Sequence, residues 1–198
     1  MKTFLKQNFP TMHRYFCYAR MLFRDFVLSE RRGHYYDGTF KQPERCLTEI
    51  IMPSHIDTIL DLGCGNGRNL IPFDGKLKLW GIDIVPKERI TFVRDFKDFL
   101  YEHLSVEQLT NRFREYPQDL SRTFIFSSGT MMYVSRKNQE RFFNVCKKNG
   151  CTSFMFQEYE PNNQNYPIEN FKLPEQMFNK QRFRDDKGLH QPVCYATF

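Results

Sequence analysis

The chain has 198 residues, of which 40% are hydrophobic and 26% charged, and its net charge is +6. This balance predicts one soluble globular domain over residues 1–198, because no apolar run reaches the roughly 18–20 residues of a membrane span and residues 1–9 lack a signal-peptide core. The six cysteines form no Cys-x-x-Cys pair and have no histidines at zinc spacing, so we expect no metal site and a reduced, cytoplasmic protein.

Residues 1–40 are expected to form an N-terminal helix and a lid segment. Thr11 can cap a helix to about Arg32, because apolar residues recur there at helical spacing and Gly33 can end it. We expect its apolar face to pack on the main domain. A basic amphipathic helix can also bind a membrane surface or a partner.

The segment 33–40 combines polar and aromatic residues in an unusual density. Loops of this kind often carry function, so His34, Tyr35 and Tyr36 are candidate site residues. The alternative is a turn whose rings only cover the core. A helix over 42–52, with Pro43 in its first turn, then leads to the first strand.

A glycine-rich turn follows the buried strand predicted at Thr58–Leu62. The pattern Gly-x-Gly-x-Gly over 63–67 lets the backbone turn sharply and lets a ligand approach its N–H groups. A short helix is expected from Asn69, with its positive end at the same spot. The second strand, Leu77–Asp83, ends in a carboxylate that can bind a ribose diol. Together these features predict a nucleotide-type pocket.

This pattern, Asp-x-Gly-x-Gly-x-Gly followed by a strand that ends in Asp, resembles motifs I and II of the class I S-adenosylmethionine (SAM)-dependent methyltransferases. A dinucleotide fingerprint would need a glycine where Arg68 stands. The resemblance implies a doubly wound α/β fold with a mostly parallel sheet, helices on both faces, a C-terminal antiparallel hairpin, and SAM as the cofactor.

The resemblance also implies roles for individual residues. Asp61 would orient the ammonium of SAM, the glycine turn would hold its methionyl part, and Asp83 would hold the ribose diol. Asp95 and the N–H of Phe96 would bind adenine. The expected cofactor-binding residues are Asp61, Gly63, Cys64, Gly65, Asn66, Gly67, Asp83, Ile84, Asp95, Phe96, Ser127 and Ser128.

The third strand is predicted at Ile90–Val93, only six residues after the second. That connection is too short for the helix that the family usually places there. Either an irregular crossover joins the strands or the third strand is displaced, and Asp98 could then replace Asp95.

The second half of the chain continues the alternation of strands and helices. Ser105-Val-Glu-Gln108 predicts a capping box and a helix to about Tyr116. Further elements are expected as a strand at 123–128, a helix from 135 to 148, a strand at 152–159, and two closing strands near 179–184 and 193–198. Glu158 would stand at the carboxyl end of the fifth strand, either as a general base or as a surface acid.

The end of the fourth strand bears on the methyl acceptor. Residues 127–133 lack the (Asp/Asn)-Pro-Pro-Tyr signature of DNA amino-methyltransferases and the catalytic aspartate of FtsJ-like ribose methyltransferases. We therefore expect methyl transfer to oxygen of a small-molecule or saccharide acceptor, with His34, Tyr36 or Glu158 as the base. An RNA methyltransferase that uses the basic N-terminal region, and a non-catalytic SAM-binding partner subunit, are the alternatives.

Overall fold

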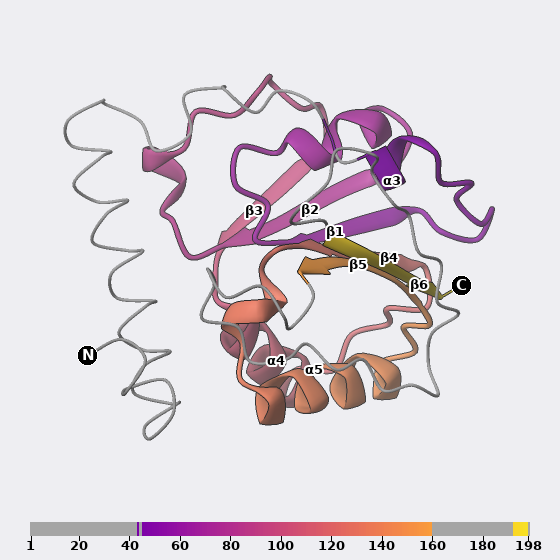
Figure 1. Ribbon diagram of the computed structural model, residues 1–198, viewed down its shortest axis with the longest axis vertical. Coiled ribbons are helices and arrows are strands. Elements are labelled where there is room, and N and C mark those ends of the chain that lie inside the picture. The colour runs from indigo at the N-terminus through magenta and orange to yellow at the C-terminus, as the bar shows by residue number, and fades with distance from the viewer. Residues whose placement is uncertain (1–42, 44, 160–191, 198) are drawn as a thin grey trace.

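The structure, a computed structural model, describes residues 43, 45–159 and 192–197. They form one six-stranded sheet in the order β3-β2-β1-β4-β5-β6 (Figure 1). The strands are β1 (Thr58–Leu62), β2 (Lys78–Asp83), β3 (Phe99–His103), β4 (Thr123–Ser128), β5 (Ser153–Tyr159) and β6 (Pro192–Thr197). The first five are parallel to one another, and β6 runs antiparallel to β5. The predicted α/β class with a mostly parallel sheet is confirmed.

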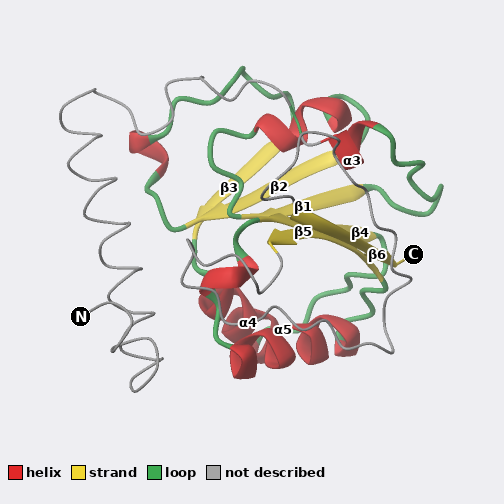
Figure 2. Cartoon of the chain, viewed as in Figure 1, coloured by secondary structure: helices red, strands yellow, loops and turns green. Residues whose placement is uncertain are grey.

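Helices cover both faces of the sheet (Figure 2). The α-helices are α3 (Arg45–Thr48), α4 (Val106–Glu115) and α5 (Arg136–Lys148), and the 3-10 helices are η1 (Arg68–Phe73), η2 (Lys87–Arg89) and η3 (Met131–Tyr133). The pair α4 and α5 packs on one face, and α3 and η1 lie on the other. No helix of the described residues is long and apolar enough to cross a bilayer.

Phenylalanine fills much of the core. On one face of the sheet, Leu60 and Ile125 pack with Phe113 and Phe143 from α4 and α5, and on the other face Ile59 and Phe124 pack with residues of α3 and η1. Because the central strands are buried on both faces, they are mostly apolar, as parallel strands usually are, and polar residues such as Asp61 and Ser127 lie toward their carboxyl ends. The rings with less than 2% exposure are those of Phe113, Phe124, Phe126, Phe142, Phe143, Phe154 and Phe156.

Two helices of the described residues begin with a side-chain cap, and the capping box predicted at Ser105 is present. The backbone N–H of Ser105 donates to Gln108 Oε1 at 2.7 Å and the backbone N–H of Gln108 donates to Ser105 Oγ at 3.2 Å, which completes the capping box of α4. Ser135 caps α5 by accepting from the N–H of Asn138 at 3.3 Å. These side chains satisfy N–H groups that a helix start otherwise leaves without a partner.

Two predicted elements differ from the structure. The helix expected over 42–52 is the single turn α3, because the β-branched pair Ile50–Ile51 and the approaching Pro53 favour extended backbone. The third strand expected at Ile90–Val93 is wrong, since β3 lies at Phe99–His103. Residues 84–98 instead form a connector that contains η2.

The N-terminal helix and the lid segment lie outside the described residues, and so does the strand expected near 179–184. The C-terminal hairpin and the division of the chain at residue 40 therefore stay predictions. The strand expected at 193–198 corresponds to β6.

Candidate active site

The site lies where the order of the strands reverses. The chain proceeds from β1 through β2 to β3 on one side, then crosses to β4 and β5 on the other side of β1. At such a switch point the connections leave in opposite directions, and a crevice opens at the carboxyl ends of the strands. The register pairs Leu62 of β1 with Ile82 of β2 and with Ser127 of β4. The glycine turn, Asp83 and the Ser127–Ser128 pair therefore meet at this edge.

The glycine turn adopts a backbone that side chains disfavour, and two protein side chains press against it. Gly63 and Gly67 have φ angles of 73° and 77°. A Cβ added to Gly63 would lie 2.1 Å from Thr130 Oγ1, and one added to Gly67 would lie 2.7 Å from Phe96 Cε2. Glycine is required here for conformation and for space alike.

The N–H groups of this turn are largely used within the protein. Those of Gly63 and Cys64 donate to the Ile82 carbonyl at 2.8 and 3.0 Å, and that of Gly67 donates to the Cys64 carbonyl at 2.9 Å. The N–H of Gly65 donates to Asp83 Oδ2 at 2.9 Å. The expectation of a turn that offers its N–H groups to a ligand is therefore wrong for these four groups. The turn is not the cradle of N–H donors that a phosphate requires.

The helix after the turn does not act as an anion site either. It is η1, a 3-10 helix of six residues that contains Pro72, rather than an α-helix. A 3-10 helix this short has few aligned peptide units and hence only a small dipole. The expected positive helix end is correspondingly weak.

Two buried carboxylates lie beside the turn instead. Asp61 is 0% exposed in β1, and Asp83 is 5% exposed at the end of β2. Burial raises the pKa of Asp83, and the N–H groups of Val85 and Gly65, which donate to its carboxylate at 2.9 Å each, counteract part of this rise. Buried negative charge suits a cationic ligand such as the SAM ammonium, and a carboxylate suits a diol, so these residues fit SAM.

Cys64 is not a nucleophile. Burial raises the pKa of its thiol well above the usual value, and the nearby carboxylates of Asp61 and Asp83 raise it further. The thiol is therefore protonated at neutral pH, and its sulfur fills the space beside Gly81, where a Cβ would lie 2.6 Å away.

The connector 84–98 brings Phe96 to the turn but leaves Asp95 exposed. The N–H of Val93 donates to the carbonyl of the buried Asn66 at 2.9 Å. The ring of Phe96 lies 5.2 Å from that of Phe99, within an aromatic cluster to which Phe92 and Tyr101 also belong. Phe96 is thereby fixed against Gly67.

Asp98 lies at the amino ends of the strands, opposite the glycine turn. Its carbonyl accepts from the N–H of Leu79, at the beginning of β2. The alternative that places Asp98 at the adenine is therefore unfavourable, because the whole length of β2 and β3 lies between Asp98 and the glycine turn.

His103 was missed by the sequence reasoning. It ends β3 beside Asp83 in the register, and its Nε2 lies 2.9 Å from the Ile84 carbonyl oxygen. The misplaced third strand hid it, because the sequence assigned the strand end to Val93.

The other candidates are placed as follows. Ser127 is buried and Ser128 half-buried at the end of β4, and Glu158 is the last residue but one of β5. His34 and Tyr36 lie outside the described residues. Among the described residues, no group of three His, Cys, Asp or Glu is placed to hold a metal ion.

Comparison with known proteins finds methyltransferases of the same fold. Residues 59–150 match the model of a methyltransferase domain family. The structure resembles the 1,6-didemethyltoxoflavin N1-methyltransferase of Burkholderia thailandensis, determined with 1,6-didemethyltoxoflavin and S-adenosylhomocysteine, at 20% identity and a TM-score of 0.58 over 91% of this chain and 88% of that one. A search of curated proteins gives no significant match.

Two further solved structures share the fold. The phosphoethanolamine N-methyltransferase 1 of Haemonchus contortus, in complex with phosphoethanolamine and S-adenosylhomocysteine, is 13% identical with a TM-score of 0.55, over 77% of this chain and 40% of that one. A SAM-dependent methyltransferase of Leishmania major is 16% identical with a TM-score of 0.53, over 74% of this chain and 66% of that one.

A pair of glycine substitutions tests the close packing at the turn. Gly67→Ala should lower the free energy of unfolding by more than Gly75→Ala, which has a similar φ of 75° but no atom within 4 Å of the added Cβ. We expect about 1–2 kcal/mol from the backbone alone at Gly75 and more at Gly67, as measured by urea unfolding. Equal losses for the two variants would show that Phe96 does not press on the turn.

Proposed function

Because residues 59–150 form a class I SAM-dependent methyltransferase domain, we propose that this enzyme transfers the methyl group of SAM to oxygen of a small-molecule or saccharide acceptor. The observation that carries the cofactor assignment is the pair of buried carboxylates, Asp61 and Asp83, beside a turn whose N–H groups are mostly taken. This arrangement favours a cationic ligand with a diol over a phosphate-rich nucleotide.

Each carboxylate has a separate role in the proposal. Asp83 accepts hydrogen bonds from the ribose diol, and the N–H groups of Gly65 and Val85 hold it in place for this. Asp61 orients the ammonium group, directly or through water. When bound, SAM supplies an activated methyl group, so the protein's contribution is to position the acceptor and to exclude water.

The adenine is proposed to lie against the connector. Phe96 supplies a ring that already contacts Gly67, and Asp95 lies next to it on an exposed stretch. Ile84 follows Asp83 directly, and its carbonyl lies near His103. These residues surround the same end of β2, which supports their assignment to one binding site.

A small acceptor is supported by the end of β4 and by the structural neighbours. Thr130 places its hydroxyl group beside the turn, and Ser127 and Ser128 end β4 just before it, so this region suits a polar acceptor. The neighbours from Burkholderia thailandensis and Haemonchus contortus were determined with a small molecule of their own. For transfer to oxygen, a base is proposed among His34, Tyr36 and Glu158.

The ribose assignment predicts a pH-dependent affinity. Binding of the diol favours the charged carboxylate, and burial has raised the pKa of Asp83 above 3.8. SAM affinity should therefore be full above this raised pKa and should fall as the pH drops through it. In Asp83→Asn the SAM affinity at neutral pH should be at least about tenfold lower, because charge-assisted hydrogen bonds are lost. The affinity of this variant should also depend less on pH.

Isothermal titration calorimetry at several pH values, with unfolding monitored in parallel, measures this effect. Asp119→Asn is the matched control, because it removes the same charge at an exposed position before β4. An Asp83→Asn variant that binds SAM as the wild type does would contradict the ribose assignment.

The acceptor class is tested by incubating the enzyme and methyl-labelled SAM with fractionated small molecules, saccharides and RNA. We expect label in a small-molecule or saccharide fraction, attached to oxygen. His34→Ala, Tyr36→Phe and Glu158→Gln should each retain SAM binding, and the variant that lacks the base should lose turnover at least a hundredfold. Label in RNA alone, or on nitrogen, would refute the proposed acceptor.

A further inference from the structure

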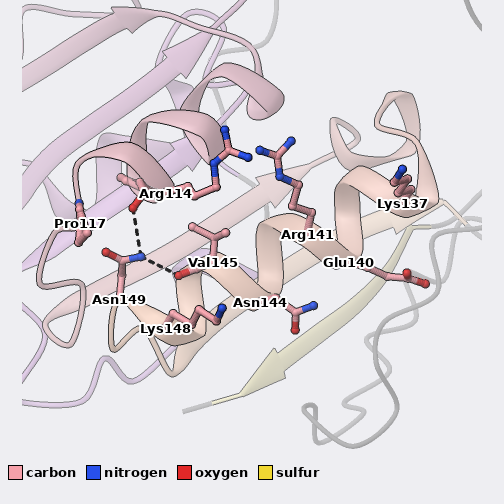
Figure 3. A pocket seen from close by; sticks show the side chains of 10 residues that line it. Arg114, Pro117, Lys137, Glu140, Arg141, Asn144, Val145, Lys148 and Asn149 are labelled. Atoms are coloured by element: carbon pink, nitrogen blue, oxygen red, sulfur yellow. Dashed lines mark hydrogen bonds between the residues drawn. The ribbon is translucent and has the colours of Figure 1, made fainter.

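A basic groove lies between α4 and α5 (Figure 3), and no residue of the glycine turn lines it. Its volume is about 610 Å³, and the buried side chains of Phe113 and Val145 contribute to its lining. Asn149 connects the two helices there, because its Nδ2 donates to the carbonyls of Phe113 and Val145 at 3.5 and 2.8 Å (Figure 3). The groove is therefore a fixed feature of the packed helix pair.

Four cations and one acid line this groove. Arg114 comes from α4, and Lys137, Arg141 and Lys148 come from α5, against the single carboxylate of Glu140. On α5, Lys137 and Arg141 are four residues apart, and Arg141 and Lys148 are seven apart. This spacing places the three cations along one side of the helix over about 16 Å. They form a row of positive charge rather than a single point.

The charges of this row are only weakly compensated. Glu140 accepts from Arg136 at 3.2 Å, and Arg136 is not part of the groove lining. Arg141 donates to the neutral amide of Asn111 at 2.6 Å. Arg114 lies 3.3 Å from Glu115, and both side chains are more than half exposed, so water screens this pair. The groove consequently favours a ligand with several negative charges.

An exposed aromatic residue stands next to the groove lining in the chain. Tyr116, the C-cap of α4, is 71% exposed and stands in the chain between Glu115 and Pro117, which lines the groove. An acidic peptide would use the cations and has no need for such a ring. Single-stranded nucleic acid uses both, because cations follow its phosphates and aromatic rings stack on its unpaired bases.

We propose that the α4–α5 groove binds single-stranded nucleic acid, with Arg114, Lys137, Arg141 and Lys148 along the phosphates and Tyr116 stacked on a base. Lys137 lies two residues after Ser135, which caps α5 just beyond the loop from the end of β4. One end of the bound nucleic acid thus lies near the carboxyl ends of the β-strands, where the candidate active site is. The binding does not depend on which acceptor is methylated.

Fluorescence anisotropy of a labelled 20-nucleotide oligouridylate with the full chain tests this proposal. The triple variant Arg114→Gln, Lys137→Gln, Lys148→Gln should bind at least tenfold more weakly at 50 mM salt. The slope of log affinity against log salt concentration should decrease by about 2, since each lost phosphate contact on a single strand contributes about 0.7. A matched triple variant, Lys78→Gln, Lys97→Gln, Lys147→Gln, removes three exposed cations outside the groove and should bind as the wild type does.

The aromatic contact is tested separately. Tyr116→Ala should weaken binding about tenfold, and Tyr116→Phe should retain it, because stacking needs the ring and not the hydroxyl. SAM affinity should be unchanged in every variant, which shows that the fold is intact. Absence of binding by the wild type, equal losses in the two triple variants, no effect of Tyr116→Ala, or equally tight binding of polyglutamate would each overturn the proposal.

Discussion

The hydrogen bond from the Gly65 N–H to the Asp83 carboxylate joins the two halves of the proposed cofactor site. It connects the turn after β1 to the end of β2, and Asp83 is only 5% exposed where it forms. A carboxylate removed from water needs hydrogen-bond donors, and Gly65 and Val85 provide them. Asp83 is therefore oriented before a ligand arrives, so binding does not have to order it. The close contacts of Thr130 and Phe96 fix the turn from other elements.

Most strands of the sheet could be predicted from the sequence, and the edge strand β3 could not. Strands β1, β2, β4 and β5 were predicted within about one residue, because each is a buried apolar run with clear turn or cap residues around it. Strand β3 lies at the edge of the sheet in the described residues, and Leu100 within it is 52% exposed. The hydrophobic pattern of β3 is accordingly weak, and the mostly apolar segment Ile90–Val93 gave a stronger strand signal.

The chemistry of the site could likewise be predicted only in part. The two carboxylates follow from motif spacing, since Asp61 and Asp83 are fixed by the strands that carry them. The contacts of Phe96 with Gly67 and of His103 with the Ile84 carbonyl depend on the path of the connector 84–98, which local sequence does not specify. The use of the turn's N–H groups also depends on the pairing of β1 with β2 rather than on the glycines themselves.

A crystal structure of the enzyme with S-adenosylhomocysteine is the most direct measurement of the central claim, that the end of β2 and the glycine turn hold the adenosyl group. The account predicts both ribose hydroxyls within hydrogen-bond distance of the Asp83 carboxylate, the ammonium group on the side of Asp61, and the bond between Gly65 and Asp83 intact. A ligand found elsewhere, or a ribose held by other residues while Asp83 contacts only the protein, would contradict it.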